Sequence, residues 1–298
     1  MASQRDVKNR IASVKNIQKI TRAMEMVAAA RLRRAEQRIA RLRPYAEAIR
    51  RMTHQAAQAA GAEAGSFPLL SEHEKVENVG LLLITGDRGL AGAFNSQIIR
   101  AGIRAGSELA EEGLQSVWYA TGRRGVSSLT FRGRELSGSY TGFTDRPAYA
   151  DARAIADDLM TGYVDGRLDR VEILYNAYVS PLTQHVTRET LLPLSQSVIE
   201  ETTADDSPKE GPSALVEYEP GPEEILKRLV PDYVEISIYR ALIESTAGFF
   251  GAQMTAMRNA SENAGTLIEE YTLQMNRARQ AEITQEIMEV VAGAEGLS

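Results

Sequence analysis

The first 60 residues constrain the fold most, because they contain no glycine and only one proline, Pro44. Apolar side chains recur there in steps of mostly three and four residues, which keeps one stripe of a helix facing a partner helix. These positions are Val7, Ile11, Val14, Ile17, Ile20, Met24, Val27, Ala35, Ile39, Leu42, Ala46, Ile49 and Met52. The pattern predicts one helix of about 50 residues, about 75–80 Å long, which Pro44 kinks or restarts.

A second helical pattern runs from Tyr233 to Val291, after the last proline of the chain, Pro231. Proline suits the first turn of a helix, and acidic residues such as Asp232 and Glu235 suit the positive end of its dipole. The pattern therefore predicts a helix of about 60 residues that begins near Pro231. Its apolar or small positions are Ile236, Ile243, Phe250, Met254, Met257, Ala264, Leu267, Tyr271, Met275, Ala278, Ile283, Ile287 and Val290.

The two ends of the chain differ in charge. Residues 1–52 hold fourteen Lys or Arg against four Asp or Glu, whereas residues 232–298 hold four Arg against ten acids. A basic helix and an acidic helix attract each other, and neither can bury an apolar stripe alone. We therefore expect the two helices to form an antiparallel coiled coil, with the middle of the chain inserted at one end. The alternative is that each helix pairs with the same helix of a second copy.

The middle of the chain alternates short apolar runs with helical patterns, which is typical of a small open α/β sheet. Strands are predicted at 79–84, 116–121, 170–179 and near 184–192, and helices at 95–110 and 151–166. The predicted fold class is α+β and mainly α, with a small Rossmann-like α/β domain inserted into the coiled coil. The expected domains are a coiled-coil helix at 1–60, an α/β domain at 75–217 and a helix at 218–298 that pairs with 1–60. The acidic stretch at 200–212 is interpreted as a mobile loop.

A glycine-rich segment, ITGDRGLAGAFN at 84–95, follows a predicted strand and precedes a predicted helix. Loops in this position can cradle phosphates. The spacing here matches neither G-x-G-x-x-G nor G-x-x-x-x-G-K-[ST], and the loop has no lysine, so nucleotide binding is disfavoured. The simplest interpretation is a tight turn that exposes Asp87 and Arg88, and a further one is that these charges contact a protein partner.

Other chemistry is poorly supported by the sequence. Cysteine is absent, which excludes disulfides and thiolate sites. His54, His73 and His185 show no metal-ligand spacing, so we interpret each as an ordinary surface residue. TGRRG at 121–125 is interpreted as a basic loop, and the most apolar run, 79–84, is too short to span a bilayer. We expect no catalytic residue, cofactor, metal site or direct bilayer insertion, and no nucleic-acid binding, because the basic N-terminal helix lacks interleaved aromatic residues.

Three segments resemble the gamma subunit of F-type ATP synthases. The first is IASVKNIQKITRAMEMVAAARLRRA at 11–35 followed by RPYAE at 43–47, and the second is ITGDRGLAGAFN at 84–95. The third is ASENA at 260–264, continued by NRARQAEITQEIMEVVAGA at 276–294. The chain departs from the family at Gly86 and Ala91, where serine and cysteine are usual. It also lacks the cysteine-bearing insert of chloroplast members, so thiol regulation of that kind is not implied.

The resemblance implies the central-stalk rotor of an H+-transporting ATP synthase, a non-catalytic subunit that couples rotation of the c-ring to conformational cycling of the catalytic beta subunits. The implied partners are the alpha, beta and epsilon subunits and the c-ring. The implied location is peripheral, at the cytoplasmic face of the cell membrane. The residues expected to contact partners are Met24, Arg88, Arg279, Gln280, Thr284, Glu286 and Glu289.

Two other functions stay open from the residues alone. One is an enzyme with a nucleotide-binding α/β domain and a coiled-coil dimerisation arm, which direct binding of ATP or NAD would favour. The other is a nucleic-acid-binding coiled coil, which steeply salt-dependent binding to duplex DNA would favour.

Overall fold

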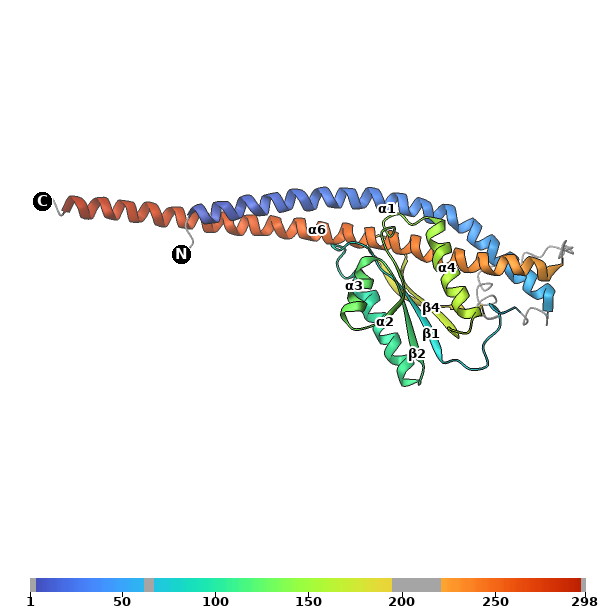
Figure 1. Ribbon diagram of the computed structural model, residues 1–298. Helices are drawn as coiled ribbons and strands as arrows, with labels where there is room; N and C mark the ends of the chain where they lie inside the picture. The colour runs from blue at the N-terminus through green and yellow to red at the C-terminus, as the bar shows by residue number, and fades with distance from the viewer. Residues whose placement is uncertain (1–3, 62–66, 195–220, 296–298) are drawn as a thin grey trace. The chain divides into compact units, whose positions relative to one another are not determined.

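The computed structural model describes residues 4–61, 67–194 and 221–295. Its first and last elements are the long helices α1 (Gln4–Ala60) and α6 (Pro222–Glu295), which confirms a long helix at each end of the chain (Figure 1). Between them lie β1 (Asn78–Ile84), α2 (Phe94–Glu111), β2 (Gln115–Thr121), α3 (Arg123–Phe131), β3 (Leu136–Tyr140), α4 (Tyr149–Val164), β4 (Arg170–Tyr178) and β5 (Gln184–Leu192). The predicted loop at 200–212 lies outside the described residues.

Both long helices run through a proline. Helix α1 has 57 residues and continues through the exposed Pro44, so the predicted restart is wrong. Helix α6 begins at Pro222, and the predicted start near Pro231 is also wrong. Leu226, Val230 and Val234 are at most 2% exposed. Burying three such side chains stabilises this turn by about 1.5–3 kcal/mol each, which exceeds the roughly 3 kcal/mol cost of a proline inside a helix.

The chain divides into two compact units. Residues 1–29 and 253–298 form one, which we call the helix-pair unit, and residues 30–252 form the other, which we call the sheet unit. The domain boundaries expected at 60, 75 and 217 stay a prediction.

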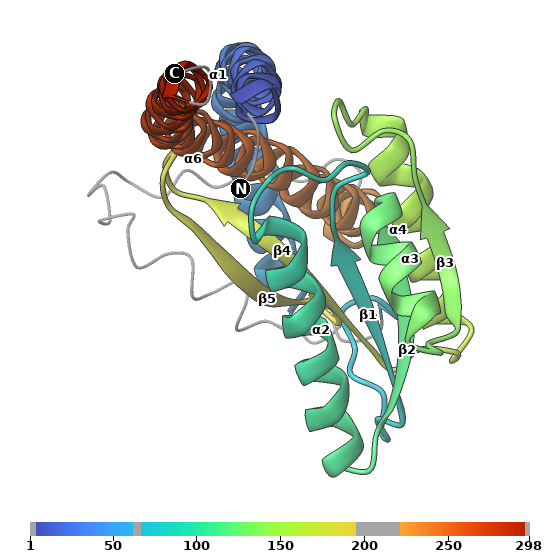
Figure 2. The ribbon, with the colours of Figure 1, turned by 90° about the vertical axis from the view of Figure 1, so that its left-hand side faces the viewer.

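The sheet unit contains a five-stranded sheet in the order β3-β2-β1-β4-β5 (Figure 2). Strand β5 is antiparallel to β4, whereas the other neighbours are parallel. This arrangement confirms the small α/β sheet. Strand β3 and helix α3 were not predicted. The segment interpreted as a basic loop at 121–125 contains the end of β2, the turn at Gly122 and the start of α3. Gly122 makes this turn with φ 81°, where a Cβ atom would lie 2.3 Å from the Thr85 carbonyl oxygen.

Apolar side chains cover both faces of the sheet. On one face, α2 and α3 pack against Leu81, Leu83 and Trp118. On the other face, α4, the 226–242 part of α6 and the 49–60 part of α1 pack against Leu82 and Ile173. A sheet buried on both faces explains why β1 is a nearly continuous apolar run in the sequence.

In the helix-pair unit, α1 and α6 pack antiparallel. Gln18 Nε2 donates to the Ser261 carbonyl oxygen at 3.3 Å, and seven residues later Glu25 pairs with Arg258 at 2.9 Å, so positions rise along one helix as they fall along the other. These contacts confirm the antiparallel coiled coil within one chain, in place of two helices that each pair with a second copy.

The seam of this helix pair differs from the predicted stripe. One set of buried or half-buried positions on α1 alternates by four and three residues, with the half-buried Met24 beside it: Val7, Ile11, Val14, Gln18, Thr21, Glu25 and Ala28. Ile17, Ile20 and Val27 were placed in the seam from their apolarity, but they are 53%, 60% and 52% exposed. The prediction is confirmed at Val7, Ile11 and Val14. At Ile17, Ile20 and Val27 it was wrong by one residue, or about 100° around the helix, because it followed apolar character instead of the heptad alternation.

Candidate partner-binding surfaces

The glycine-rich turn after β1 is held by the Asp87 carboxylate. This group accepts hydrogen bonds from the Arg123 amide at 3.1 Å, the Gly142 amide at 2.9 Å and the Thr144 hydroxyl at 2.8 Å. Burial raises the pKa of Asp87, but these hydrogen bonds outweigh burial and leave the pKa below its ordinary value. Asp87 therefore joins β1, the start of α3 and the loop after β3, and the prediction that it is simply exposed was wrong.

Several backbone amides at this edge of the sheet are already satisfied within the chain. Asn95 Oδ1 accepts from the Gly86 amide at 2.8 Å, and Asn95 Nδ2 donates to the Arg88 carbonyl oxygen at 3.1 Å. In the first turn of α3, the Gly125 amide donates to Thr85 Oγ1 at 2.9 Å. A phosphate cradle needs free amides pointing outward, and these amides point to the chain's own side chains.

The crevice at the carboxyl ends of β1 and β4 is where α/β sheets of this order bind ligands. Here Phe249 of α6 packs edge-on against Phe94, with ring centroids 5.5 Å apart. Thr246 of α6 donates to the Thr144 carbonyl oxygen at 2.9 Å. The cavity left between these residues is about 10 Å³, which is the space of one water molecule. Helix α6 thus fills the position that a nucleotide would need.

Arg88 is the candidate contact residue in the sheet unit. Its side chain is 65% exposed, and its Nε lies 3.3 Å from an oxygen of Asp145. Asp145 also pairs with Arg31 of α1 at 3.2 Å. An exposed ion pair of this kind contributes at most about 1 kcal/mol, so it leaves Arg88 available to a partner.

Met24 lies half-buried at the edge of an exposed apolar surface in the helix-pair unit. Ile17, Ile20 and Val27 lie within about 80° of one another around α1, together with Met24, and we call these four residues the α1 stripe. Exposed apolar stripes of this kind mark interaction sites. The strict four-three alternation that starts at Val7 is the sequence signal that could have identified this surface.

The other candidate residues, Arg279, Gln280, Thr284, Glu286 and Glu289, lie near the end of α6. Every residue from 279 to 292 is exposed in the chain. Gln285 Nε2 donates to Glu289 at 2.9 Å, and the Thr284 hydroxyl donates to the Gln280 carbonyl oxygen at 2.8 Å, so these polar groups pair along their own helix. Apolar Ile287 and Val290 are also exposed, at 57% and 72%.

The candidate contact residues do not form one cluster. Met24 lies one residue from Glu25, which pairs with Arg258. Arg279 is 21 residues further along α6, or about 30 Å away at 1.5 Å per residue. The helix-pair unit therefore presents two separate surfaces, the α1 stripe and the exposed end of α6.

His73 is not the ordinary surface residue that the sequence suggested. Its Nδ1 lies 2.9 Å from Asp169 Oδ1, and its ring stacks on Tyr163 with centroids 4.5 Å apart. Asp169 also accepts from the amides of Glu77 and Asn78 at 2.9 and 2.8 Å. Burial raises the pKa of Asp169, but the hydrogen bonds outweigh it and lower the pKa. The group fixes the loop before β1, and its members are too far apart in sequence for spacing to show it.

Residues 4–61, 67–194 and 221–295 hold neither a membrane-spanning helix nor a group of metal ligands. In this part of the chain, no helix combines the length and apolarity that crossing a membrane requires. Within the same ranges, no three His, Cys, Asp or Glu side chains gather as metal ligands would.

Known proteins resemble this chain along its whole length. The family model described as ATP synthase matches residues 3–297. The ATP synthase gamma chain of Rubrobacter xylanophilus is 41% identical over 100% of this chain and 99% of its own length. The ATP synthase gamma chain of Moorella thermoacetica is 42% identical over the full length of both.

Solved structures agree on the fold. A chain in the cryo-EM structure of the Euglena gracilis mitochondrial ATP synthase, OSCP/F1/c-ring, aligns over 99% of this chain and 94% of its own, with a TM-score of 0.67 and 16% identity. A chain in the central stalk/c-ring structure of the Tetrahymena thermophila mitochondrial ATP synthase gives a TM-score of 0.58 at 24% identity, over 81% of this chain and 99% of its own. With two relatives above 40% identity over their whole length, this chain belongs to the gamma-chain family of ATP synthases.

Proposed function

We propose that this chain is the rotor shaft of the central stalk in an H+-transporting ATP synthase. The observation that carries the proposal is the antiparallel pair of helices α1 and α6. Helix α6 ends in exposed polar and apolar residues. A shaft must be internally paired, and it must offer different contacts to each conformational state of its surroundings, because equal contacts shift no equilibrium. The membership of the gamma-chain family supports this role.

We propose that the chain itself performs no catalysis. The filled crevice beside Phe249 and the satisfied amides around Asp87 support this, since the nucleotide position of the sheet is taken by α6 and by the chain's own carboxylate. ATP chemistry then takes place in partner subunits.

The proposed partners are the alpha and beta subunits around the helix pair, and epsilon and the c-ring around the α/β domain. The helices at 1–60 and 218–298 would form the shaft, and 75–217 the domain that joins the c-ring. Met24 and the α1 stripe suit a partly apolar surface of beta, and the basic side chains on other sides of α1, such as Lys15 and Lys19, favour acidic surroundings. Arg88 and the five α6 residues suit polar contacts that change partner as the shaft turns. The assembly would lie at the cytoplasmic face of the cell membrane, without insertion of this chain.

Reconstitution tests the proposal. The chain is mixed with purified alpha and beta subunits, the complex is isolated by gel filtration, and a bead on the sheet unit is followed during ATP hydrolysis. We expect a stable complex and rotation in one direction. A chain that elutes alone and binds ATP or duplex DNA with a micromolar dissociation constant would contradict the shaft role. It would favour one of the two other functions.

A further inference from the structure

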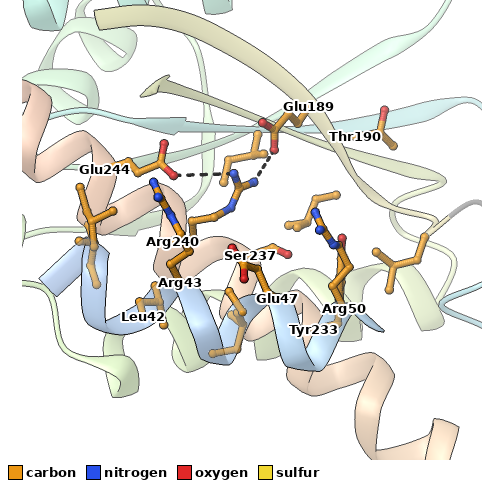
Figure 3. Close-up of a pocket in the computed structure, with 17 residues that line it drawn as sticks. Leu42, Arg43, Glu47, Arg50, Glu189, Thr190, Tyr233, Ser237, Arg240 and Glu244 are labelled. Carbon is orange, nitrogen blue, oxygen red and sulfur yellow. Dashed lines mark hydrogen bonds and ion pairs between the residues drawn. The ribbon is translucent and has the colours of Figure 1, made fainter. Parts of the chain in front are cut away.

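A cavity of about 750 Å³ lies inside the sheet unit, between α1, α6 and β5 (Figure 3). Sites for small molecules usually have volumes of about 300–1,000 Å³ and apolar walls with a few polar groups. Each side contributes apolar side chains, with Ile39, Leu42 and Ala46 from α1, Ile173, Leu191 and Leu194 from the strand side, and Ile236 and Ile243 from α6, and charged side chains lie between them. The cavity can therefore hold an apolar chain.

Most charges of the lining neutralise one another. Arg240 pairs with Glu189 at 2.9 Å and with Glu244 at 3.7 Å, and its guanidinium lies over the Tyr175 ring. Burial raises the pKa of Glu244, and the positive charges of Arg240 and Arg43 oppose that rise. Arg43 is therefore close enough to Glu244 to interact with its carboxylate. These groups form a balanced network and are not available to a ligand.

Arg50 is different. It lines the cavity beside Tyr233, and among the described residues it forms no ion pair within 4.0 Å (Figure 3). Burial raises the pKa of Tyr233, so its hydroxyl stays protonated at neutral pH and can donate a hydrogen bond. A guanidinium and a neutral hydroxyl side by side in a cavity with apolar side chains on its other walls match a carboxylate head and its chain. Glu47, three residues before Arg50 on α1, also lines the cavity and opposes an anion.

We propose that this cavity binds a single-chain amphipathic carboxylic acid, with the carboxylate on Arg50 and Tyr233 and the alkyl chain along the walls from α1, α6 and β5. The site does not depend on the proposed function. It joins three elements that meet within the sheet unit, so a bound acid would stabilise their packing.

The test uses the full chain, with every segment present, and dodecanoate below its micelle concentration as the probe in titration calorimetry. We expect saturable binding of one dodecanoate per chain. Arg50→Gln should weaken binding by at least about tenfold, since it removes the charged hydrogen-bond partner of the carboxylate. Arg51→Gln, on the neighbouring exposed arginine outside the cavity, is the matched control and should leave binding unchanged. Glu47→Gln should tighten binding.

Two further arms test the cavity and the carboxylate. Ala46→Phe fills the cavity and should abolish binding while thermal unfolding stays cooperative, and Ser237→Leu serves the same purpose if that variant does not fold. Dodecanol, which has the same chain without the charge, should bind at least about tenfold more weakly. Equal binding of dodecanoate and dodecanol, or equal loss in Arg50→Gln and Arg51→Gln, would overturn the proposal. So would unchanged binding to a folded, cavity-filled variant, or binding that appears only with anionic phospholipid vesicles.

Discussion

Helix α1 contributes to both units, but it buries different side chains in each. Between residues 49 and 60 in the sheet unit, Ile49, Ala56 and Ala57 are at most 7% exposed and join a core that includes side chains of four strands and α4. Between residues 14 and 28 in the helix-pair unit, the seam contains Gln18 and Glu25, while apolar side chains face outward. One helix therefore serves two purposes, stability in one unit and contact surface in the other.

The two units should differ most in how much stability is lost when an apolar side chain is shortened. Leu82 of β1 is fully buried, so Leu82→Ala should lower the free energy of unfolding by about 2–5 kcal/mol. Ile17→Ala removes a similar number of atoms from the α1 stripe. It should change the free energy of unfolding by no more than about 0.5 kcal/mol. Urea unfolding followed by circular dichroism measures both. Similar losses in the two variants would mean that the stripe is buried in the isolated chain.

The next effect concerns Asp87, whose hydrogen bonds hold three elements of the sheet unit together. Asp87→Asn should lower the free energy of unfolding at pH 7 by about 1–3 kcal/mol, because an amide cannot accept at both of its positions. The folded-state pKa lies below the ordinary 3.8. Asp87 therefore adds stability that is fully present above about pH 4 and is lost as the pH falls through the lower, folded-state pKa.

Unfolding at pH 7 and at pH 3 measures this pH dependence. The Asp87→Asn variant should lose less stability on acidification than the natural chain does. Asp157→Asn, at an exposed position of α4, is the matched control and should behave like the natural chain. An equal slope in all three proteins would show that the Asp87 carboxylate is not linked to folding.

A substitution of Gln18, a polar residue in the seam of the helix pair, should have a smaller effect on stability and one of opposite sign. Gln18 is half-buried, and its hydrogen bond to Ser261 is long at 3.3 Å. Gln18→Leu should stabilise the helix pair by about 0.5–1 kcal/mol, since the gain in apolar burial exceeds the loss of a weak hydrogen bond. Hydrogen exchange of the α1 amides measures it, with the exposed Asn16→Leu as control. Faster exchange in Gln18→Leu would show instead that the hydrogen bond contributes more than apolar contact.

Local sequence patterns predicted the elements that are long or strongly apolar. Strand β1 at 78–84 and helix α4 at 149–164 lie within two residues of the predicted bounds. Helix α3 and strand β3 were missed because they are short, nine and five residues, and β3 carries small side chains at a sheet edge. Gln18 was missed in the seam because its burial depends on α6, where Gly265 leaves room for it.

The site was harder to predict than the fold. Asp87 meets Gly142 and Thr144 across more than 50 residues, and His73 meets Asp169 across 96, so no local spacing contains these contacts. The contact residues at Met24 and at 279–289 came from the family resemblance, and they stay predictions until partner subunits are present. The structure adds that Met24 belongs to the α1 stripe, whose other members, Ile17, Ile20 and Val27, are exposed.

A substitution at the α1 stripe should have the smallest effect on stability, but it should change the coupling of ATP hydrolysis to proton transport. Met24→Lys places a cation at the edge of the α1 stripe, and it should leave assembly with alpha and beta intact. In an assembled ATP synthase the new charge should favour one state of an acidic partner surface by about 0.5–1 kcal/mol, which would lower proton transport per ATP by about two- to fivefold. ATP-driven acidification of membrane vesicles, divided by the rate of ATP hydrolysis, measures this ratio. Met26→Lys is the matched control, because Met26 is 64% exposed but lies about 180° from Ile17 around α1. If both variants, or neither, lower the ratio, the α1 stripe is not the coupling surface, and the difference between the two units is one of packing alone.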